Sequence, residues 1–212
     1  MTTMSSDAWP AERGSAAVPD QTGDEARTVE ASLADPARFG LIFDRYFAEI
    51  HGYIARRLTS DAADDIAAET FAIAFRQRDR FDANRGIVRG WLYGIATNLI
   101  GRHRRREIRE YRAIQRTGSM TAADGPAEPA DALLAARTVR SQVARALAEL
   151  SRGDRDVLLL VALGGLSHAE VAQALGIPYG TVGSRLSRVR RKLRTQLSGN
   201  APGIGQEVTG NG

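Results

Sequence analysis

The apolar residues in the first part of the chain recur every three or four positions. Seven side chains between residues 39 and 53 keep this spacing: Phe39, Ile42, Phe43, Tyr46, Phe47, Ile50 and Tyr53. A stripe with this period predicts one amphipathic helix with a buried face. A second helix is expected from Ser60, an N-cap residue followed by acids that suit a helix start, to about Arg78. A third is expected from Ile87 to about Arg109.

The second part of the chain carries the local signals of a helix-turn-helix. Ser167 and Glu170 form a capping-box pattern at the start of a short helix that ends at Leu175. Gly176 follows as a left-handed C-cap, and Pro178 suits the first turn of another helix because its missing N–H is not needed there. Two helices are expected to precede this unit, one through Val143, Leu147 and Leu150 and one from Asp154 to about Leu163.

The order of these segments predicts an all-α fold, because no run of alternating β-branched residues indicates a sheet. We expect two small helical domains joined by a flexible linker, with the helix-turn-helix in the second domain. Stretches rich in Ala, Gly, Pro and Asp set the boundaries. The expected organisation is a disordered acidic tail at 1–37, a first domain at 38–112, a linker at 113–133, a second domain at 134–197 and a disordered tail at 198–212.

Composition excludes several function classes. The 212 residues include no cysteine, and the three histidines have no ligand-like spacing, so we expect no disulfide, no metal site and no cofactor. No glycine-rich phosphate loop occurs. The longest apolar stretch, Val157 to Leu166, is about half the roughly 20 residues that a membrane-spanning helix needs, and the first residues lack the features of a secretory signal. We therefore expect a cytoplasmic protein.

The formal net charge of +4 conceals a division along the chain. Residues 1–37 carry seven acids and two arginines, which leaves a charge of +9 on the remainder. Excess positive charge indicates a polyanionic partner. A nucleic acid is favoured over a membrane surface, because no apolar amphipathic face accompanies the basic runs.

The last expected helix separates an apolar face from a basic one. At about 100° per residue, one narrow stripe collects Val182, Leu186, Val189 and Leu193. The opposite face carries Ser184, Ser187, Arg188 and Arg191. Guanidinium groups pair with guanine edges in a major groove and with phosphates, and a capped turn before such a helix favours DNA contact. A merely solvated basic face is the alternative.

Two charged segments of the first domain also suggest partners. Like charges stack along one helix face at Asp61, Asp65 and Glu69, which favours a docking surface for a basic partner over a merely solvated face. The run from Arg102 to Arg106 exceeds what a helix C-terminus needs and suits a nucleic-acid backbone. Trp91 and Phe81 have the spacing of core residues, with base stacking as the less favoured alternative.

Two pairs of segments resemble conserved regions of the extracytoplasmic-function (ECF) sigma factors of the sigma-70 family. That family's second region is similar to Ala63-Asp-Asp-Ile-Ala-Ala-Glu-Thr-Phe71 and Arg89-Gly-Trp-Leu-Tyr-Gly-Ile-Ala-Thr-Asn-Leu99. Its fourth region is similar to Leu166-Ser-His-Ala-Glu-Val-Ala-Gln-Ala-Leu-Gly-Ile-Pro178 and Gly180-Thr-Val-Gly-Ser-Arg-Leu-Ser-Arg188. The resemblance covers roughly residues 38 to 197.

The resemblance implies an RNA polymerase sigma factor that binds core polymerase and directs promoter-specific transcription initiation, in response to a stress or envelope signal. Such a protein catalyses no reaction. The first domain would be sigma region 2 and the second domain sigma region 4. The implied partners are the clamp helices of the largest polymerase subunit, the flap of the second-largest subunit, promoter DNA and an anti-sigma factor.

The resemblance also assigns roles to individual residues. Core-polymerase binding is implied for Asp61, Asp64, Asp65, Glu69, Thr70 and Phe71. Contact with the minus-ten element is implied for Gly86, Ile87, Val88, Arg89, Asn98, Arg102, Arg105 and Arg106. Contact with the minus-thirty-five element is implied for Tyr179, Thr181, Gly183, Ser184, Arg185, Ser187, Arg188 and Arg191. Gly183 departs from relatives with Arg or Lys at this place, which removes one DNA contact and weakens the helix by up to about 1 kcal/mol.

Two other function classes compete with this interpretation. A stand-alone helix-turn-helix regulator would bind its operator without polymerase and use the first domain for sensing or dimerisation. The acidic stripe and the Asp-Asp-Ile motif argue against it. An enzyme acting on nucleic acid would need a clustered set of carboxylates and metal ligands, which the basic segments lack.

Overall fold

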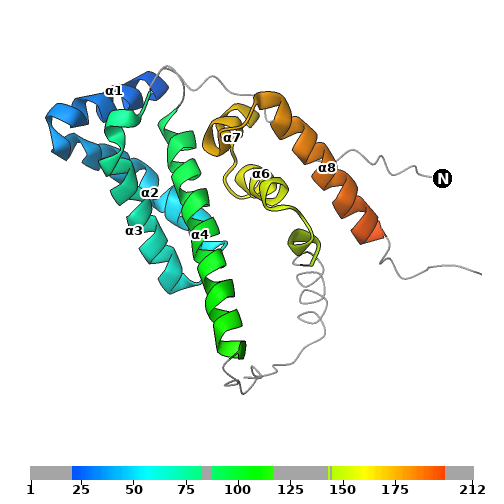
Figure 1. Cartoon of the computed structure of the whole chain (residues 1–212). Coiled ribbons are helices and arrows are strands. Elements are labelled where there is room, and N and C mark those ends of the chain that lie inside the picture. The colour runs from blue at the N-terminus through cyan, green and yellow to red at the C-terminus, as the bar shows by residue number, and fades with distance from the viewer. Residues whose placement is uncertain (1–20, 83–86, 117–142, 144, 199–212) are drawn as a thin grey trace, which may run out of the picture.

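The computed structural model describes residues 21–82, 87–116, 143 and 145–198, and every regular element within these ranges is a helix. The prediction of an all-α fold is therefore confirmed (Figure 1). The elements are α1 (Gln21–Ala34), η1 (Pro36–Arg38), α2 (Phe39–Ala55), α3 (Ser60–Arg76), η2 (Arg78–Arg80), α4 (Val88–Arg116), α6 (Arg152–Ala162), α7 (His168–Leu175) and α8 (Tyr179–Ser198).

The first half is built on α2, α3 and α4, close to the predicted ranges. Five positions of the α2 stripe are buried: Phe39, Ile42, Tyr46, Ile50 and Tyr53. The N-cap of α3 is Thr59, one residue before the expected Ser60, and its side chain makes no capping hydrogen bond. Helix α4 continues to Arg116, beyond the expected end at Arg109.

A helix lies where the sequence predicts a disordered acidic tail, so that prediction is wrong for residues 21–34 of the expected 1–37 tail. Val29 and Ser32 of this helix, α1, are buried. Glu25 accepts a 2.6 Å hydrogen bond from the Tyr46 hydroxyl of α2. One buried aliphatic residue and a few polar contacts hold α1, which explains why no apolar periodicity announces it. Residues 1–20 lie outside the described part of the chain.

Helices α6, α7 and α8 form the predicted helix-turn-helix unit, which is confirmed. The capping box at the start of α7 is complete: the Ser167 hydroxyl accepts from the Glu170 amide at 3.3 Å, and the Glu170 carboxylate accepts from the Ser167 amide at 2.8 Å. Gly176 ends α7 with a φ of +61°, the left-handed conformation that glycine adopts without steric cost. Of the expected preceding helix, residues 143 and 145–148 are helical.

The two halves correspond to the two expected helical domains, and they pack against each other around one hydrophobic core. Helix α4 stands in the middle, with α1–α3 on one side and α6–α8 on the other (Figure 1). One buried cluster combines side chains of the first half, such as Leu92 and Tyr93, with Leu160, Leu166 and Val171 of the second half. Helix α4 is apolar on more than one face, so it packs in both directions. Residues 113–116 of the expected linker belong to α4, and residues 117–133 lie outside the described part.

Candidate functional site

The outer face of α8 presents the hydroxyl and guanidinium groups that the sequence predicts for DNA contact. Val182, Leu186 and Val189 are buried against the rest of the molecule, so helix geometry turns the opposite side outward. Exposed on α8 are Tyr179, Ser184, Ser187, Arg188 and Arg191. Half-buried beside them are Thr181, Gly183 and Arg185.

Two of these arginines lie against the start of α6. The Arg188 guanidinium donates to the Asp154 carboxylate at 3.2 Å, and that carboxylate side chain is only 3% exposed. The Arg185 guanidinium lies over Gly153, where an added Cβ would collide with it. The pairing fixes Arg188 in place, but it also means that removing Arg188 leaves a buried carboxylate without its partner. Arg191 therefore probes DNA contact more cleanly than Arg188 does.

Helix α3 displays an exposed row of carboxylates, which we call the acidic face. Its members are Asp61, Asp64, Asp65 and Glu69. Thr70 and Phe71, which the resemblance assigns to polymerase contact, are buried instead. The Thr70 hydroxyl donates to the Ile66 carbonyl at 2.7 Å, and the Phe71 ring packs edge-on against Phe43 with centroids 5.0 Å apart. Neither side chain is available for direct contact with a partner.

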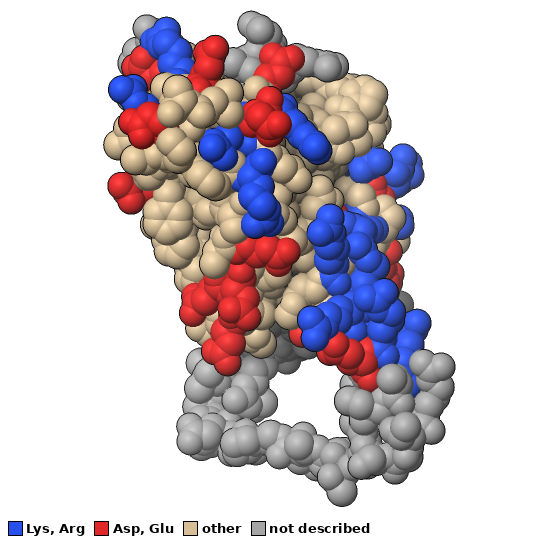
Figure 2. All heavy atoms as spheres, turned by 60° about the vertical axis from the view of Figure 1, so that its left-hand side comes forward, with Lys and Arg blue, Asp and Glu red and all other residues tan. Residues whose placement is uncertain are grey.

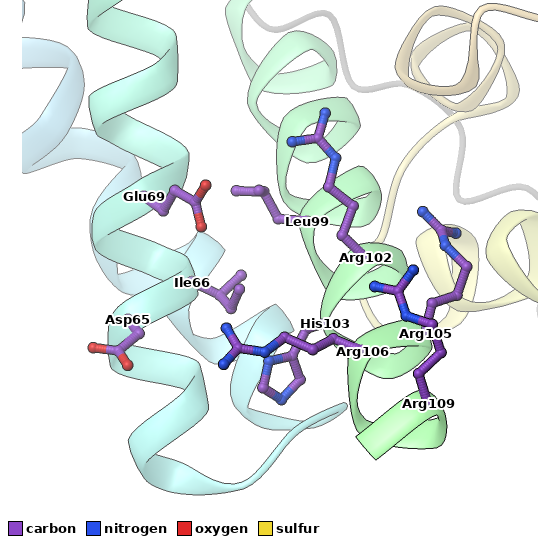
Figure 3. Close-up of a pocket in the computed structure, with 9 residues that line it drawn as sticks. All are labelled: Asp65, Ile66, Glu69, Leu99, Arg102, His103, Arg105, Arg106 and Arg109. Atoms are coloured by element: carbon purple, nitrogen blue, oxygen red, sulfur yellow. The ribbon is translucent and has the colours of Figure 1, made fainter. Parts of the chain in front are cut away.

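A pocket of about 510 Å³ separates the acidic face from the basic end of α4. Asp65 and Glu69 line one wall, and the opposite wall is lined by Arg102, His103, Arg105, Arg106 and Arg109 (Figure 3). Ile66 and Leu99 supply its apolar lining. On the surface, acidic and basic side chains form two neighbouring groups (Figure 2). Among the described ion pairs, none links an α3 carboxylate to an α4 guanidinium. Two residues of the basic wall pair within α4 instead, Arg106 with Glu110 at 2.6 Å and His103 with Glu107 at 3.4 Å.

Phe43 is an exposed aromatic side chain, although the sequence pattern predicts that it belongs to the buried stripe of the first helix. Its residue is 39% exposed, and its ring stacks on Phe47 with centroids 4.8 Å apart. Phe47 in turn contacts Phe71, beside the acidic face. The sequence does hold a signal, because positions 43 and 47 lie at the edge of the apolar stripe and not at its centre.

The residues expected to contact the minus-ten element divide into two groups. Asn98, Arg102, Arg105 and Arg106 are exposed on α4. At the start of α4, by contrast, Val88 is buried and Ile87 and Arg89 are half-buried under α7. Gly86 lies outside the described residues. Trp91 and Phe81 contact each other, with ring centroids 5.1 Å apart.

Arg89 is the centre of a polar cluster between the two halves. Its guanidinium contacts the Glu49 carboxylate at 2.6 Å, the Glu170 carboxylate at 2.8 Å and the Gly164 carbonyl at 2.6 Å. Burial alone would lower the pKa of Arg89, but the bonds to both carboxylates outweigh it and raise that pKa above its ordinary value. Burial acts in the opposite direction on a carboxyl group and would raise the pKa of Glu170. Hydrogen bonds from Ser167 and Arg89 outweigh this effect and hold that pKa below its ordinary value. No motif or spacing in the sequence indicates this cluster.

The residues that the structure describes hold neither a metal-ligand group nor a membrane-spanning helix. Within these ranges, no group of three His, Asp or Glu side chains is placed to hold a metal ion. None of the helices in the same part of the chain combines the length and apolar character that crossing a bilayer requires.

Comparison with known families matches both halves of the chain. Residues 42–110 match the model of sigma-70 region 2, and residues 140–193 match the model of sigma-70 region 4. Both ranges fall within the two expected domains.

Comparison with individual proteins finds relatives over most of the chain. The RNA polymerase sigma factor CnrH of Cupriavidus metallidurans is 34% identical over 85% of this chain and 97% of its own length. The ECF sigma factor SigW of Bacillus subtilis is 34% identical over 81% of this chain and 95% of its own. A solved structure of CnrH with the cytosolic domain of CnrY superposes with a TM-score of 0.56 and 26% identity, covering 84% of this chain and 99% of that one. The chain therefore belongs to the ECF sigma factors of the sigma-70 family.

Proposed function

We propose that this sigma factor directs promoter-specific initiation by dividing the work between its two halves. The first half binds core polymerase and the minus-ten element, and α8 of the second half reads the minus-thirty-five element. The observation that carries this division is the separation of charge: carboxylates are exposed on α3, while guanidinium and hydroxyl groups are exposed on α8. The chain acts by binding and catalyses no reaction itself.

The outer face of α8 supports duplex recognition. Its exposed hydroxyls and guanidiniums are the groups that hydrogen-bond to base edges and phosphates in a major groove. Ser184 and Ser187 carry short side chains that allow close approach, and Arg188 and Arg191 supply charge on the same side. The half-buried Gly183 adds no side chain to this surface.

The acidic face and the adjoining pocket support binding to core polymerase. A partner helix with charges of both signs would place cations against Asp65 and Glu69 and anions against the α4 arginines. The family resemblance implies that this partner is the pair of clamp helices of the largest subunit. Phe43 and Phe47 add an apolar contact beside the charges, with the buried Phe71 as their support.

The test is co-elution of the full chain with sigma-free core polymerase. The variant Asp65→Arg, Glu69→Arg reverses two charges on the acidic face, and we expect it to lose co-elution. The matched control is Glu30→Arg, Asp79→Arg, which reverses two exposed carboxylates outside α3 and should co-elute like the wild type. A wild-type chain that binds duplex DNA but ignores core polymerase would contradict the proposal and favour the stand-alone regulator.

The place of action and the regulation of this chain follow from the same proposal. A factor that works on RNA polymerase acts in the cytoplasm. CnrH is known in complex with the cytosolic domain of CnrY. We infer that a partner protein, the anti-sigma factor that the family resemblance implies, regulates this chain in response to a stress or envelope signal.

A further inference from the structure

Helix α7 covers the start of α4 with the Gln173 side chain, which makes two hydrogen bonds to one backbone residue. The Gln173 carboxamide accepts from the Ile87 amide at 2.9 Å and donates to the Ile87 carbonyl at 2.9 Å. A donor and an acceptor side by side are also what the edge of adenine offers, and glutamine and adenine pair through these groups in protein–DNA complexes. Gln173 therefore occupies both backbone hydrogen-bonding groups of Ile87.

A second side chain of α7, Glu170, forms an ion pair with the neighbouring Arg89. The Glu170 carboxylate binds the Arg89 guanidinium at 2.8 Å, and a guanidinium group pairs with a phosphate in the same way. The same carboxylate accepts from the Ser167 amide, so the helix cap holds it in place. Glu170 and Gln173 thus present an anion and a base-like edge from one face of one helix.

The backbones of α4 and α7 approach most closely at Gly94, where nothing larger than glycine fits without a backbone shift. An added Cβ at Gly94 would lie 2.5 Å from the Ala174 carbonyl oxygen, and one at Gly90 would lie 2.8 Å from the Gln173 side-chain oxygen. A buried ion pair between Arg57 and Asp156, 2.9 Å long, joins α6 to the segment that follows α2. Several independent contacts therefore hold the two halves together.

We propose that α7 is an internal mimic of the minus-ten strand, and that Gln173 and Glu170 keep the start of α4 from DNA until the halves separate. This inference rests on the proposed function, since it takes residues 87–89 as part of the minus-ten surface. The outer face of α8 stays exposed in the same conformation. The closed chain thus binds duplex DNA through α8 while it withholds its single-strand surface.

Gly94→Ala is the sharpest variant for testing this closure. Alanine strengthens a helix interior relative to glycine, so α4 itself is not weakened, but the new methyl group would collide with the Ala174 backbone. The matched control is Gly52→Ala in α2, where nothing lies within 4 Å of the added Cβ. A second variant, Glu170→Gln with Gln173→Ala, removes the mimicking groups. It keeps an acceptor for the helix cap, because glutamine also serves in a capping box.

The first measurement is hydrogen exchange of the full chain without polymerase, followed in peptides covering residues 87–93. The second is fluorescence anisotropy with a labelled single-stranded DNA of randomised sequence and a labelled duplex. We expect both opening variants to exchange about tenfold faster in this segment and to bind the single strand up to about tenfold tighter, because apparent affinity scales with the open fraction. Duplex affinity should stay within twofold, and Gly52→Ala should match the wild type in every measurement.

If hydrogen exchange of residues 87–93 in both variants stays within twofold of the wild type, the proposal that α7 covers the start of α4 is overturned. Faster exchange without tighter single-strand binding would overturn the mimicry. Faster exchange in α2 and α3 as well would show that Gly94→Ala unfolds the chain, and the double variant then decides between the outcomes by the same criteria. None of these readings uses polymerase, so a failure of the co-elution test would leave the closure standing and remove only its assignment to the minus-ten element.

Discussion

The ion pair between Arg57 and Asp156 offers the most quantitative test of how the two halves are held together. Its nitrogen and oxygen lie 2.9 Å apart, and the two side chains are only 4% and 11% exposed. Arg57 also donates to the Tyr53 hydroxyl, and its Nε is the buried side-chain nitrogen without a hydrogen-bond partner among the described residues. The pair is therefore desolvated and incompletely satisfied.

Removing one partner should cost much more than removing both. Asp156→Ala leaves a buried guanidinium without its anion, which typically costs about 3–5 kcal/mol. We expect the lower end, about 3 kcal/mol, because Arg57 keeps its bond to Tyr53. Arg57→Met with Asp156→Leu removes both charges and fills the space, and such replacements are often neutral or stabilising. Tyr53 then still has its hydrogen bond to Thr97 at 3.0 Å.

The assay is urea unfolding followed by helical circular dichroism. With a slope of about 2 kcal/mol per molar urea, a loss of 3 kcal/mol lowers the midpoint by about 1.5 M. The matched control is Glu110→Ala, which breaks the exposed pair with Arg106 and should not shift the midpoint measurably. A cost for Asp156→Ala below about 1 kcal/mol, or a double variant as unstable as the sum of the single ones, would refute the reasoning.

Three further predictions concern single positions. Gly176→Ala puts a side chain on a residue with left-handed backbone angles, so it should destabilise the chain by about 1 kcal/mol in the same urea assay. Gly183→Ala adds a methyl group in open space on α8 and favours the helix, so it should stabilise the chain by up to about 1 kcal/mol. The pKa of Glu170 in the folded chain lies below its ordinary value of 4.5. The ion pair of Glu170 with Arg89 therefore stabilises the fold fully above pH 4.5, and this stabilisation is lost as the pH falls through the lowered pKa. Glu170→Gln should therefore narrow the stability difference between pH 7 and pH 3, measured from urea midpoints. Arg191→Ala should weaken duplex binding and reduce the salt slope of the binding constant by about one, which titrations at several salt concentrations would check.

Local patterns in the sequence determined the helices and the exposed, basic side of α8. A capping box, a left-handed glycine and an amphipathic stripe involve residues within four positions of one another, so their geometry follows from the helix itself. For the same reason the exposed row of acids on α3 was predictable. Membership of the family also followed from the sequence, because its motifs are contiguous.

Only the tertiary structure decided which of these surfaces are accessible. Arg89 and Glu170 are 81 positions apart, and neither has a periodicity or motif that announces their pairing. Helix α1 was missed because Val29 is an isolated buried aliphatic residue among polar ones. Phe71, expected at the polymerase surface, is buried, and Phe43, expected in the core, is exposed. Burial at the edge of an apolar stripe depends on which helix packs beside it. The sequence specifies each helix through local energetics, whereas the shared core depends on contacts between distant segments, which no local pattern encodes.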